Sequence, residues 1–264
     1  MPAAHWPEGV GRIDLPSVDS TNAEAFRRAP QLTGPCWILA GEQTAGRGRR
    51  ARAWASPRGN FHATLLMHPA EPPQVVALRS FAAALALRDA LEAATGTGAG
   101  LALKWPNDVL MNGGKVAGIL LESQGTGQGI AALAIGIGVN LIAHPDAAQV
   151  EPGALRPVSV LSECGLRLTP AAFLDHLAPA FARWEALFQA RGFAPLRAAW
   201  LEQAARLGER ITARTGTEVR EGIFDTIDAE GNLVLRMAHG TVAIPAAEVF
   251  FPENEQGNAH ASSH

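Results

Sequence analysis

The hydrophobic and polar positions up to residue 207 divide the chain into strands and helices. Short apolar runs predict strands over 36–42, 60–68, 101–105, 108–111, 115–122 and 130–141. The run 60–68 alternates between apolar and polar residues, which favours a strand. Apolar residues at helical spacing predict helices over 75–94, 170–191 and 194–207. These segments predict one larger domain of strands and helices.

Cap and turn residues mark where these elements begin and end. Thr21 with Glu24 three positions later resembles a capping box, which opens a short helix through Arg28. Pro106 separates two short strands, because proline cannot donate to a strand ladder. Asn112-Gly113-Gly114 is typical of a tight hairpin turn, so we expect the chain to return directly into the strand that starts at Lys115.

The pattern changes after residue 207. Short β runs alternate with turns from 208 to 252, and about 45 residues are too few to bury much core alone. We therefore expect a larger domain over 1–207 and a small β-barrel over 208–252 that packs on it. The polar tail over 253–264 is expected to be disordered.

Composition narrows the function classes. The chain has 264 residues, of which 47% are hydrophobic and 18% charged, as in ordinary globular proteins. A net charge of −3 argues against a dedicated nucleic-acid binder. The first residues do not form a signal peptide, and the longest apolar run (130–143) is short and interrupted by Gly and Asn. We therefore expect a cytoplasmic protein that neither spans a membrane nor uses its two cysteines as a disulfide framework.

Lysine is rare and clustered. Of 22 cationic residues only Lys104 and Lys115 are lysines. Arginine does not replace lysine where a compact ammonium must touch one or two oxygens, so both are candidates for specific chemistry, with chance clustering as the alternative. Lys104 could neutralise phosphate, and the oxygens of Asn107 and Asp108 suit Mg²⁺. The alternatives are an ordinary Asn-Asp turn and an exposed hairpin lysine.

An arginine-rich segment and several small or polar residues complete the candidates. Residues 46–58 hold five arginines and no acidic residue, which favours a site for carboxylate or phosphate, or else a solvated basic loop or a nucleic-acid patch. Gly46 and Gly48 allow its backbone to approach a ligand. A flat ligand could lie against Gly118. Other candidate contacts, each with a plain structural alternative as a helix cap or a packed strand end, are Ser20, Thr21, Asn22, Gln43, Gly138 and Asn140. No Walker A, GxGxxG, HExxH or GxSxG sequence occurs, so any ATP site must be of another kind.

Six segments occur in a fixed order: DSTN, GEQTAGRGRR, W, KWPND, GGKVAGILLE and GIGVN. In this order they resemble the catalytic domain of biotin–protein ligases, and the small β domain resembles the SH3-like domain that follows it in that family. The resemblance covers about residues 12–252. It implies an α+β fold of the class II synthetase-like type, in which helices flank a mixed β-sheet, followed by an SH3-like β-barrel.

The resemblance also implies an activity. Biotin would react with ATP, with Mg²⁺ as cofactor, to give biotinyl-5′-AMP, and would then pass to a lysine of a biotin carboxyl carrier protein. The related lipoate–protein ligases are the nearest alternative. A nucleic-acid-binding module and a non-catalytic binding protein are alternatives of other classes.

The same resemblance implies that the biotin head is contacted by Ser20, Thr21, Asn22 and Gln43. It implies that the loop of Arg47, Gly48 and Arg49 closes over biotin and the adenylate. Lys115 contacts the carboxylate and the reacting phosphate. Lys104, Asn107 and Asp108 form the phosphate and Mg²⁺ group, with Asp108 also a possible base or orienting group in the transfer. Trp54 stacks near the adenine.

The sequence departs from the family pattern at two places. Ala51 stands where the family usually has Gly, which predicts a stiffer loop, and Ala247-Glu248-Val249 replaces a GEV-like motif. The first motif begins at Asp19, which leaves no room for the DNA-binding domain that some members carry. The resemblance therefore predicts a monofunctional enzyme without a nucleic-acid partner, as a monomer or a homodimer.

Overall fold

A computed structural model describes residues 5–125, 129–146, 150 and 153–251. Its larger part is built on a seven-stranded sheet in the order β1-β2-β3-β7-β6-β5-β4. Only the β1–β2 pair within this sheet is parallel, so the sheet is mixed, as expected. The strands are β1 (Gly11–Leu15), β2 (Cys36–Ala40), β3 (Phe61–Met67), β4 (Leu101–Lys104), β5 (Asp108–Met111), β6 (Gly114–Gln124) and β7 (Ala132–Val139).

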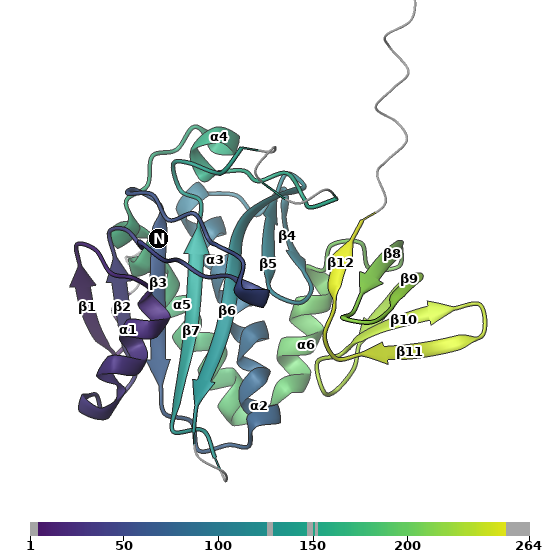
Figure 1. Ribbon diagram of the computed structural model, residues 1–264, viewed down its shortest axis with the longest axis horizontal. Helices are drawn as coiled ribbons and strands as arrows, with labels where there is room; N and C mark the ends of the chain where they lie inside the picture. Colours follow the sequence, from purple (N-terminus) through teal and green to yellow (C-terminus); the bar gives the residue numbers. More distant parts are fainter. Residues whose placement is uncertain (1–4, 126–128, 147–149, 151–152, 252–264) are drawn as a thin grey trace, which may run out of the picture.

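Helices cover both faces of this sheet (Figure 1). The helices α3 (Arg79–Thr95) and α5 (Pro170–Arg191) pack on one face together with α6 (Phe193–Glu202), and α1 (Thr21–Arg28) lies on the other. Short helices α2 (Pro73–Ala77) and α4 (Val160–Cys164) connect the elements. The layered arrangement confirms the α+β expectation.

The strand predicted over 60–68 is confirmed as β3, which lies between these layers. It is buried from Phe61 to Leu66. Phe61 and Leu65 belong to the cluster under α3 and α5, whereas Leu66 packs in the cluster beside α1. The polar residues His62 and Thr64 are buried as well, which means that their hydrogen bonds must be made inside the protein.

Two helix predictions are corrected. The single helix expected over 75–94 is two helices, because the chain breaks at Leu78 between α2 and α3. The capping box at Thr21 does not form: Ser20 is the N-cap residue and its side chain makes no capping bond. The Glu24 carboxylate instead accepts from Arg27 and Arg28. The elements β1 and α4 were not predicted from the sequence.

The C-terminal part is a second sheet of five antiparallel strands in the order β11-β10-β9-β8-β12. The strands are β8 (Arg210–Arg214), β9 (Val219–Ile227), β10 (Leu233–Met237), β11 (Gly240–Ile244) and β12 (Glu248–Phe250). Trp200 of α6 packs on Phe224 of β9, and Trp105 Nε1 donates to the Gly231 carbonyl at 3.1 Å. The small β domain therefore packs on the larger one, as expected. The boundary at 207/208 stays a prediction, and the tail over 253–264 lies outside the described residues.

The described part of the chain gives two further results. Each of its helices is too short or too polar to cross a bilayer. Cys36 is buried and Cys164 exposed, and both are free thiols.

Candidate functional site

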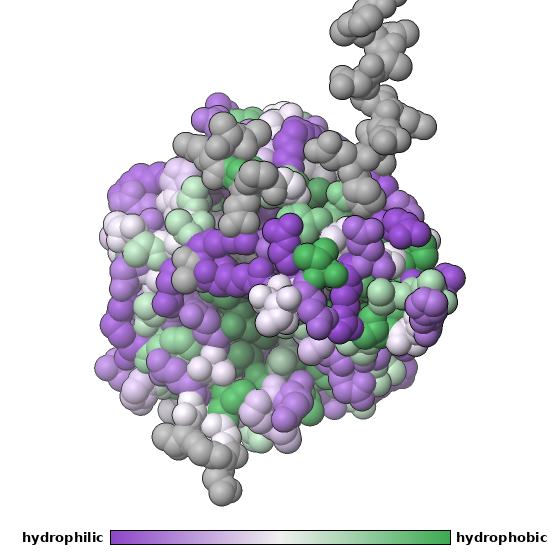
Figure 2. All heavy atoms as spheres, turned by 45° about the vertical axis from the view of Figure 1, so that its right-hand side comes forward, coloured by the Kyte–Doolittle hydropathy of each residue, from purple (hydrophilic) through white to green (hydrophobic). Residues whose placement is uncertain are grey.

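One cavity of about 490 Å³ opens on the face of the sheet that carries α1. Figure 2 shows a hollow whose floor is hydrophobic (green), beneath a band of hydrophilic residues (purple). Gly46 and Arg58, two candidates from the arginine-rich segment, do not line the cavity. The candidate contacts that line it are Ser20, Thr21, Asn22, Gln43, Arg47, Gly48, Arg49, Trp54, Lys104, Asn107, Asp108, Lys115, Gly118, Gly138 and Asn140. The fold thus brings together residues that lie up to 120 positions apart along the chain.

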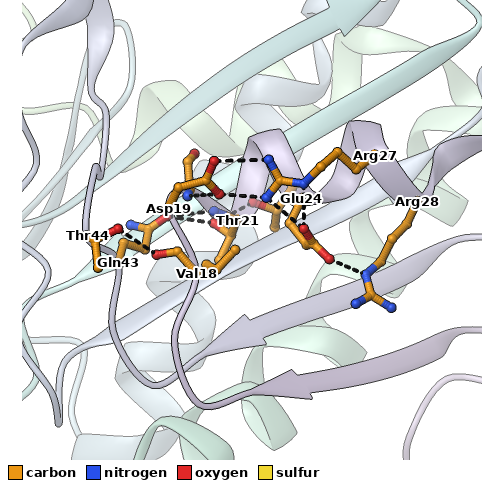
Figure 3. A network of polar contacts seen from close by, with 10 residues as sticks. Val18, Asp19, Thr21, Glu24, Arg27, Arg28, Gln43 and Thr44 are labelled. Carbon is orange, nitrogen blue, oxygen red and sulfur yellow. Dashed lines mark hydrogen bonds and ion pairs between the residues drawn. The ribbon is translucent and has the colours of Figure 1, made fainter.

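One end of the cavity, here called the polar end, consists of Ser20, Thr21, Asn22 and Gln43. The first three are buried at the start of α1. The preceding residue, Asp19, holds this start in place, because its carboxylate accepts from both terminal nitrogens of Arg27 (2.6 and 3.0 Å) and from the Ser20 amide (2.7 Å) (Figure 3). The Arg27 hydrogen bonds and the Ser20 amide lower the pKa of Asp19 to about 2, so Asp19 stays charged at physiological pH.

Most polar atoms at this end already have partners in the protein. The Thr21 amide and hydroxyl both donate to Gln43 Oε1 (2.8 and 3.0 Å). Asn22 Nδ2 donates to Glu122 at 2.8 Å, and Asn22 Oδ1 accepts from Thr64 at 2.6 Å. The Ser20 hydroxyl, in contrast, has no hydrogen-bond partner among the described residues. The polar end is therefore a preformed arrangement that offers a ligand only its remaining donor and acceptor capacity.

Part of the cavity floor is glycine backbone, beside the hydrophobic side chains of Ile119, Leu120 and Ile137. Gly118 of β6 and Gly138 of β7 pair with each other across the sheet. The indole of Trp54 lies on both, because a Cβ at Gly138 would stand 2.5 Å from Nε1 and one at Gly118 would stand 3.2 Å from the ring. The flat group that lies against Gly118 is the protein's own Trp54, and the flat ligand expected there stays a prediction. Its buried Nε1 has no acceptor within the described chain.

The other end, here called the cationic end, centres on Asp108 at the start of β5. Lys115 Nζ is 2.7 Å from Asp108 Oδ1, and Lys104 Nζ is 3.8 Å from Asp108 Oδ2. Burial alone would raise the pKa of Asp108, but the ammonium groups of Lys115 and Lys104 outweigh it and lower the pKa overall. Burial lowers the pKa of Lys104, and the Asp108 carboxylate offsets this only in part. One carboxylate thus holds both lysines of the chain in place.

The predicted magnesium ligands lie at this end. Among the residues that the structure describes, no three His, Cys, Asp or Glu side chains are grouped so as to hold a metal ion. Asn107 and Asp108 both line the cavity, and Asn107 Oδ1 accepts weakly from Arg49 at 3.4 Å. Two oxygen ligands beside two ammonium groups are too few to hold an Mg²⁺ ion alone. They suit an Mg²⁺ ion that is bound mainly by the phosphates of a nucleotide.

The arginine-rich segment is not the bare cationic loop that its composition indicated. Its arginines pair with carboxylates from elsewhere in the chain: Arg47 with Glu122, Arg50 and Arg52 with Glu248, and Arg58 with Glu42. Arg50 adopts a left-handed backbone (φ 56°), which is unfavourable for a residue with a side chain. Half-buried Arg49 instead faces Asn107 and the Ala247 carbonyl, and Arg58 does not line the cavity. The side chain of Ala51 lies outside the described structure.

Sequence reasoning missed the contribution of the C-terminal domain to the cavity. Glu248, Phe250 and Phe251 line it, and Lys104 Nζ lies 5.7 Å from the ring centroid of Phe251. The altered motif Ala247-Glu248-Val249 was the available signal, but it did not show what Glu248 contacts. Asn140 lines the cavity too, although its Nδ2 donates to the Val158 carbonyl at 2.9 Å, which is a structural bond.

Comparisons with known proteins identify the family of the chain. Residues 14–140 match the model of the biotin/lipoate A/B protein ligase family, and residues 207–251 match the biotin protein ligase C-terminal domain. The chain is 60% identical to a biotin–[acetyl-CoA-carboxylase] ligase of Paracoccus denitrificans, over 90% of this chain and 99% of that protein. It is 32% identical to a bifunctional ligase/repressor of Bacillus subtilis, over 89% of this chain and 71% of that protein.

A solved structure shows the same fold. The biotin protein ligase of Aquifex aeolicus, in complex with biotin and ATP, has a TM-score of 0.76 with this structure at 24% identity. The match covers 90% of this chain and 97% of that one. The chain therefore belongs to the biotin/lipoate A/B protein ligase family, and within it to the biotin protein ligases.

Proposed function

We propose that the protein activates biotin with ATP as biotinyl-5′-AMP and transfers the biotinyl group to a lysine of a biotin carboxyl carrier protein. One observation carries the proposal. A single cavity joins a neutral polar end, a floor that includes two glycines and a cationic end that holds both lysines of the chain. Such a cavity suits a molecule with a polar ring, an apolar chain and a carboxylate that must react with phosphate.

In the first step a carboxylate oxygen of biotin attacks the α-phosphorus of ATP, the bond to the bridging oxygen breaks, and pyrophosphate leaves. Both reactants are anions, so charge repulsion and positioning make up most of the barrier. Lys115, which is one-third exposed to the cavity and held by Asp108, can contact both anions. Arg49 and Lys104 add positive charge at the same end, and Mg²⁺ bound with ATP near Asn107 and Asp108 would neutralise phosphate charge.

In the second step the amine of the carrier lysine attacks the carbonyl carbon, the bond to the phosphate oxygen breaks, and AMP leaves. The amine must lose a proton during the transfer. We assign Asp108 an orienting role in this step, because the two ammonium groups that lower its pKa also make it a weak base. Arg47 and Arg49 would keep the mixed anhydride from water and from premature release.

The polar end favours biotin over lipoate. Biotin carries a ureido group with one carbonyl and two N–H groups. The ring of lipoate has sulfur as its only heteroatom and carries no N–H or carbonyl group. Ser20, Asn22 and Gln43 provide hydroxyl and amide groups for a ureido group, and such groups would lose hydrogen bonds against an apolar ring. The use of ATP and a carrier protein places the reaction in the cytoplasm in our proposal.

Incubation of the purified protein with biotin, ATP, Mg²⁺ and a biotin carboxyl carrier domain tests the proposal. We expect mass spectrometry to show one biotinyl group on one lysine of the carrier, and no lipoyl group when lipoate replaces biotin. A carrier of unchanged mass with biotin, or faster modification with lipoate, would show that the proposal is wrong.

A further inference from the structure

We propose that Ser56, which lies outside the cavity, is a positioning residue that fixes the Gln43 amide and links the polar end to the arginine-rich segment. The inference rests on the proposed function and adds to it a residue that no sequence motif had singled out. Ser56 is half-buried and is absent from the cavity lining. It can therefore act on a substrate only through its neighbours.

The orientation of the Gln43 amide is determined by its partners. The oxygen and nitrogen of an amide are told apart by the hydrogen bonds they make. The Thr21 backbone amide can only donate, so the atom of Gln43 that it meets at 2.8 Å must be the carbonyl oxygen. Gln43 Nε2 consequently faces Ser56 Oγ, at 2.9 Å. One Nε2 hydrogen is used there, and the other has no acceptor within the described residues and is available to a ligand in the cavity.

Ser56 passes this connection on to the arginine-rich segment. Having accepted from Gln43, its hydroxyl donates to the Trp54 carbonyl at 3.1 Å. The Trp54 amide in turn donates to the Gly46 carbonyl at 2.9 Å. Thr21, Gln43, Ser56 and Trp54 thus form one chain of hydrogen bonds, in which each group has a fixed role. The chain joins the start of α1 to the segment that carries Arg47 and Arg49.

The packing around Gly46 shows how closely the arginine-rich segment approaches Ser56 and Gln43. A Cβ at Gly46 would stand 2.6 Å from Ser56 Oγ, 2.6 Å from the Trp54 carbonyl oxygen and 3.1 Å from Gln43 Nε2. The first two distances are shorter than any normal contact between a Cβ and an oxygen atom. Glycine at this position therefore lets the segment close on Ser56, which differs from the close approach to a ligand that the sequence indicated.

A second link joins the same two regions but is weaker. Glu122 Oε2 accepts from Asn22 at 2.8 Å and from Arg47 at 3.2 Å. The side chains of Arg47 and Glu122 are 47% and 31% exposed, and exposed ion pairs contribute little. Ser56 is accordingly the link whose loss should disturb both ligand recognition at the polar end and closure of the segment.

The variant Ser56→Ala tests this inference, with Ser80→Ala as its matched control. Ser80 on α3 also donates to a backbone carbonyl, that of Ala77 at 2.9 Å, but lies away from the cavity. In biotin-dependent pyrophosphate exchange we expect Ser56→Ala to raise the KM for biotin about three- to tenfold, as for one lost hydrogen bond, and to leave the KM for ATP nearly unchanged. Release of free biotinyl-5′-AMP should rise, and the thermal midpoint should stay close to that of Ser80→Ala.

A double-mutant cycle with Gln43→Ala shows whether Ser56 acts through Gln43. We expect Ser56→Ala to have little further effect on the KM for biotin once Gln43 is removed. Additive effects, or equal changes in both KM values, would overturn the inference. If Ser56→Ala does not fold, Gly46→Ala serves as the second variant, and a KM for biotin unchanged in it would overturn the inference as well. Failure of the proposed function would look different, since the unaltered protein would then show no exchange with biotin.

Discussion

The two ends of the cavity are built in different ways. At the polar end, neutral groups of α1, β3 and the segment after β2 bond to one another, and the ion pairs Asp19–Arg27 and Arg47–Glu122 lie next to them. At the cationic end, the Asp108 carboxylate holds both Lys115 and Lys104, and Glu248 of the C-terminal domain holds Arg50. The first end is preorganised before any ligand binds. At the second, anions that bind must share these cations with the carboxylates that hold them.

This contrast predicts that salt, charge and pH act on the two ends unequally. Neutral hydrogen bonds are insensitive to ionic strength, whereas exposed ion pairs are screened. Changes at the cationic end should therefore alter catalysis and retention of the intermediate, and changes at the polar end should alter recognition of biotin. The following variants test that division.

Lys115→Ala or Lys115→Arg is expected to have the largest effect. Either change removes the compact ammonium that Asp108 holds at 2.7 Å, and adenylate formation should fall at least about tenfold. Biotin-dependent pyrophosphate exchange measures it. Because the polar end is untouched, binding of biotin alone should weaken less than exchange does, although the contact of Lys115 with the biotin carboxylate is lost. Unchanged exchange in both variants would remove Lys115 from the mechanism.

Arg49→Ala and Arg47→Ala should both release free biotinyl-5′-AMP into solution, the former more strongly. Arg49 is half-buried against Asn107 and the Ala247 carbonyl, while Arg47 is exposed and pairs with Glu122. We expect about tenfold more release for Arg49→Ala and a smaller increase for Arg47→Ala. Chromatography of the reaction supernatant measures it, and equal or absent increases would contradict the assigned difference.

Glu248→Gln should weaken the contact between the C-terminal domain and the arginine-rich segment. It removes the carboxylate that Arg50 and Arg52 share, and since these pairs are partly exposed we expect only about a threefold rise in free adenylate. Glu218→Gln is the control, because Glu218 pairs with Arg220 in the same domain away from the cavity. Trypsin should cleave the segment faster in Glu248→Gln than in the control. Identical cleavage rates would exclude this role for Glu248.

The smallest expected effect is a shift in the alkaline limb of the pH profile. Burial lowers the pKa of Lys104, so its ammonium loses the proton at a lower pH than that of an exposed lysine. If the charged form assists the reaction, exchange should fall as pH rises through that pKa. Lys104→Arg keeps the charge to higher pH and should move this decline upward. A decline at the same pH in the variant would assign it to another group.

Local signals predicted much of the fold and the site. The rarity of lysine singled out Lys104 and Lys115, and the structure places both beside Asp108. The turn at Asn112-Gly113-Gly114 correctly predicted that β5 returns into β6, because short-range turn chemistry determines such a connection. The alternating run over 60–68 predicted that β3 is a strand. It did not show that both faces of β3 are buried, because no local pattern indicates which helices cover the sheet.

Contacts between distant segments could not be predicted. Arg50 and Glu248 are 198 positions apart, and composition alone made the arginine-rich segment look unpaired. The sequence also did not show that the Asn22 amide donates to Glu122, 100 positions away. The hydrogen bonds that run through Ser56 end on the backbone carbonyls of Trp54 and Gly46. The positions of these carbonyls follow only from the folded chain.

Pyrophosphate exchange by the purified protein tests the central claim most directly. Labelled pyrophosphate, ATP and Mg²⁺ are incubated with biotin, with lipoate or with neither, and incorporation of label into ATP is measured. We predict incorporation that requires biotin, is much lower with lipoate and disappears in Lys115→Ala. Incorporation that does not depend on biotin, or that lipoate supports better, would contradict the account.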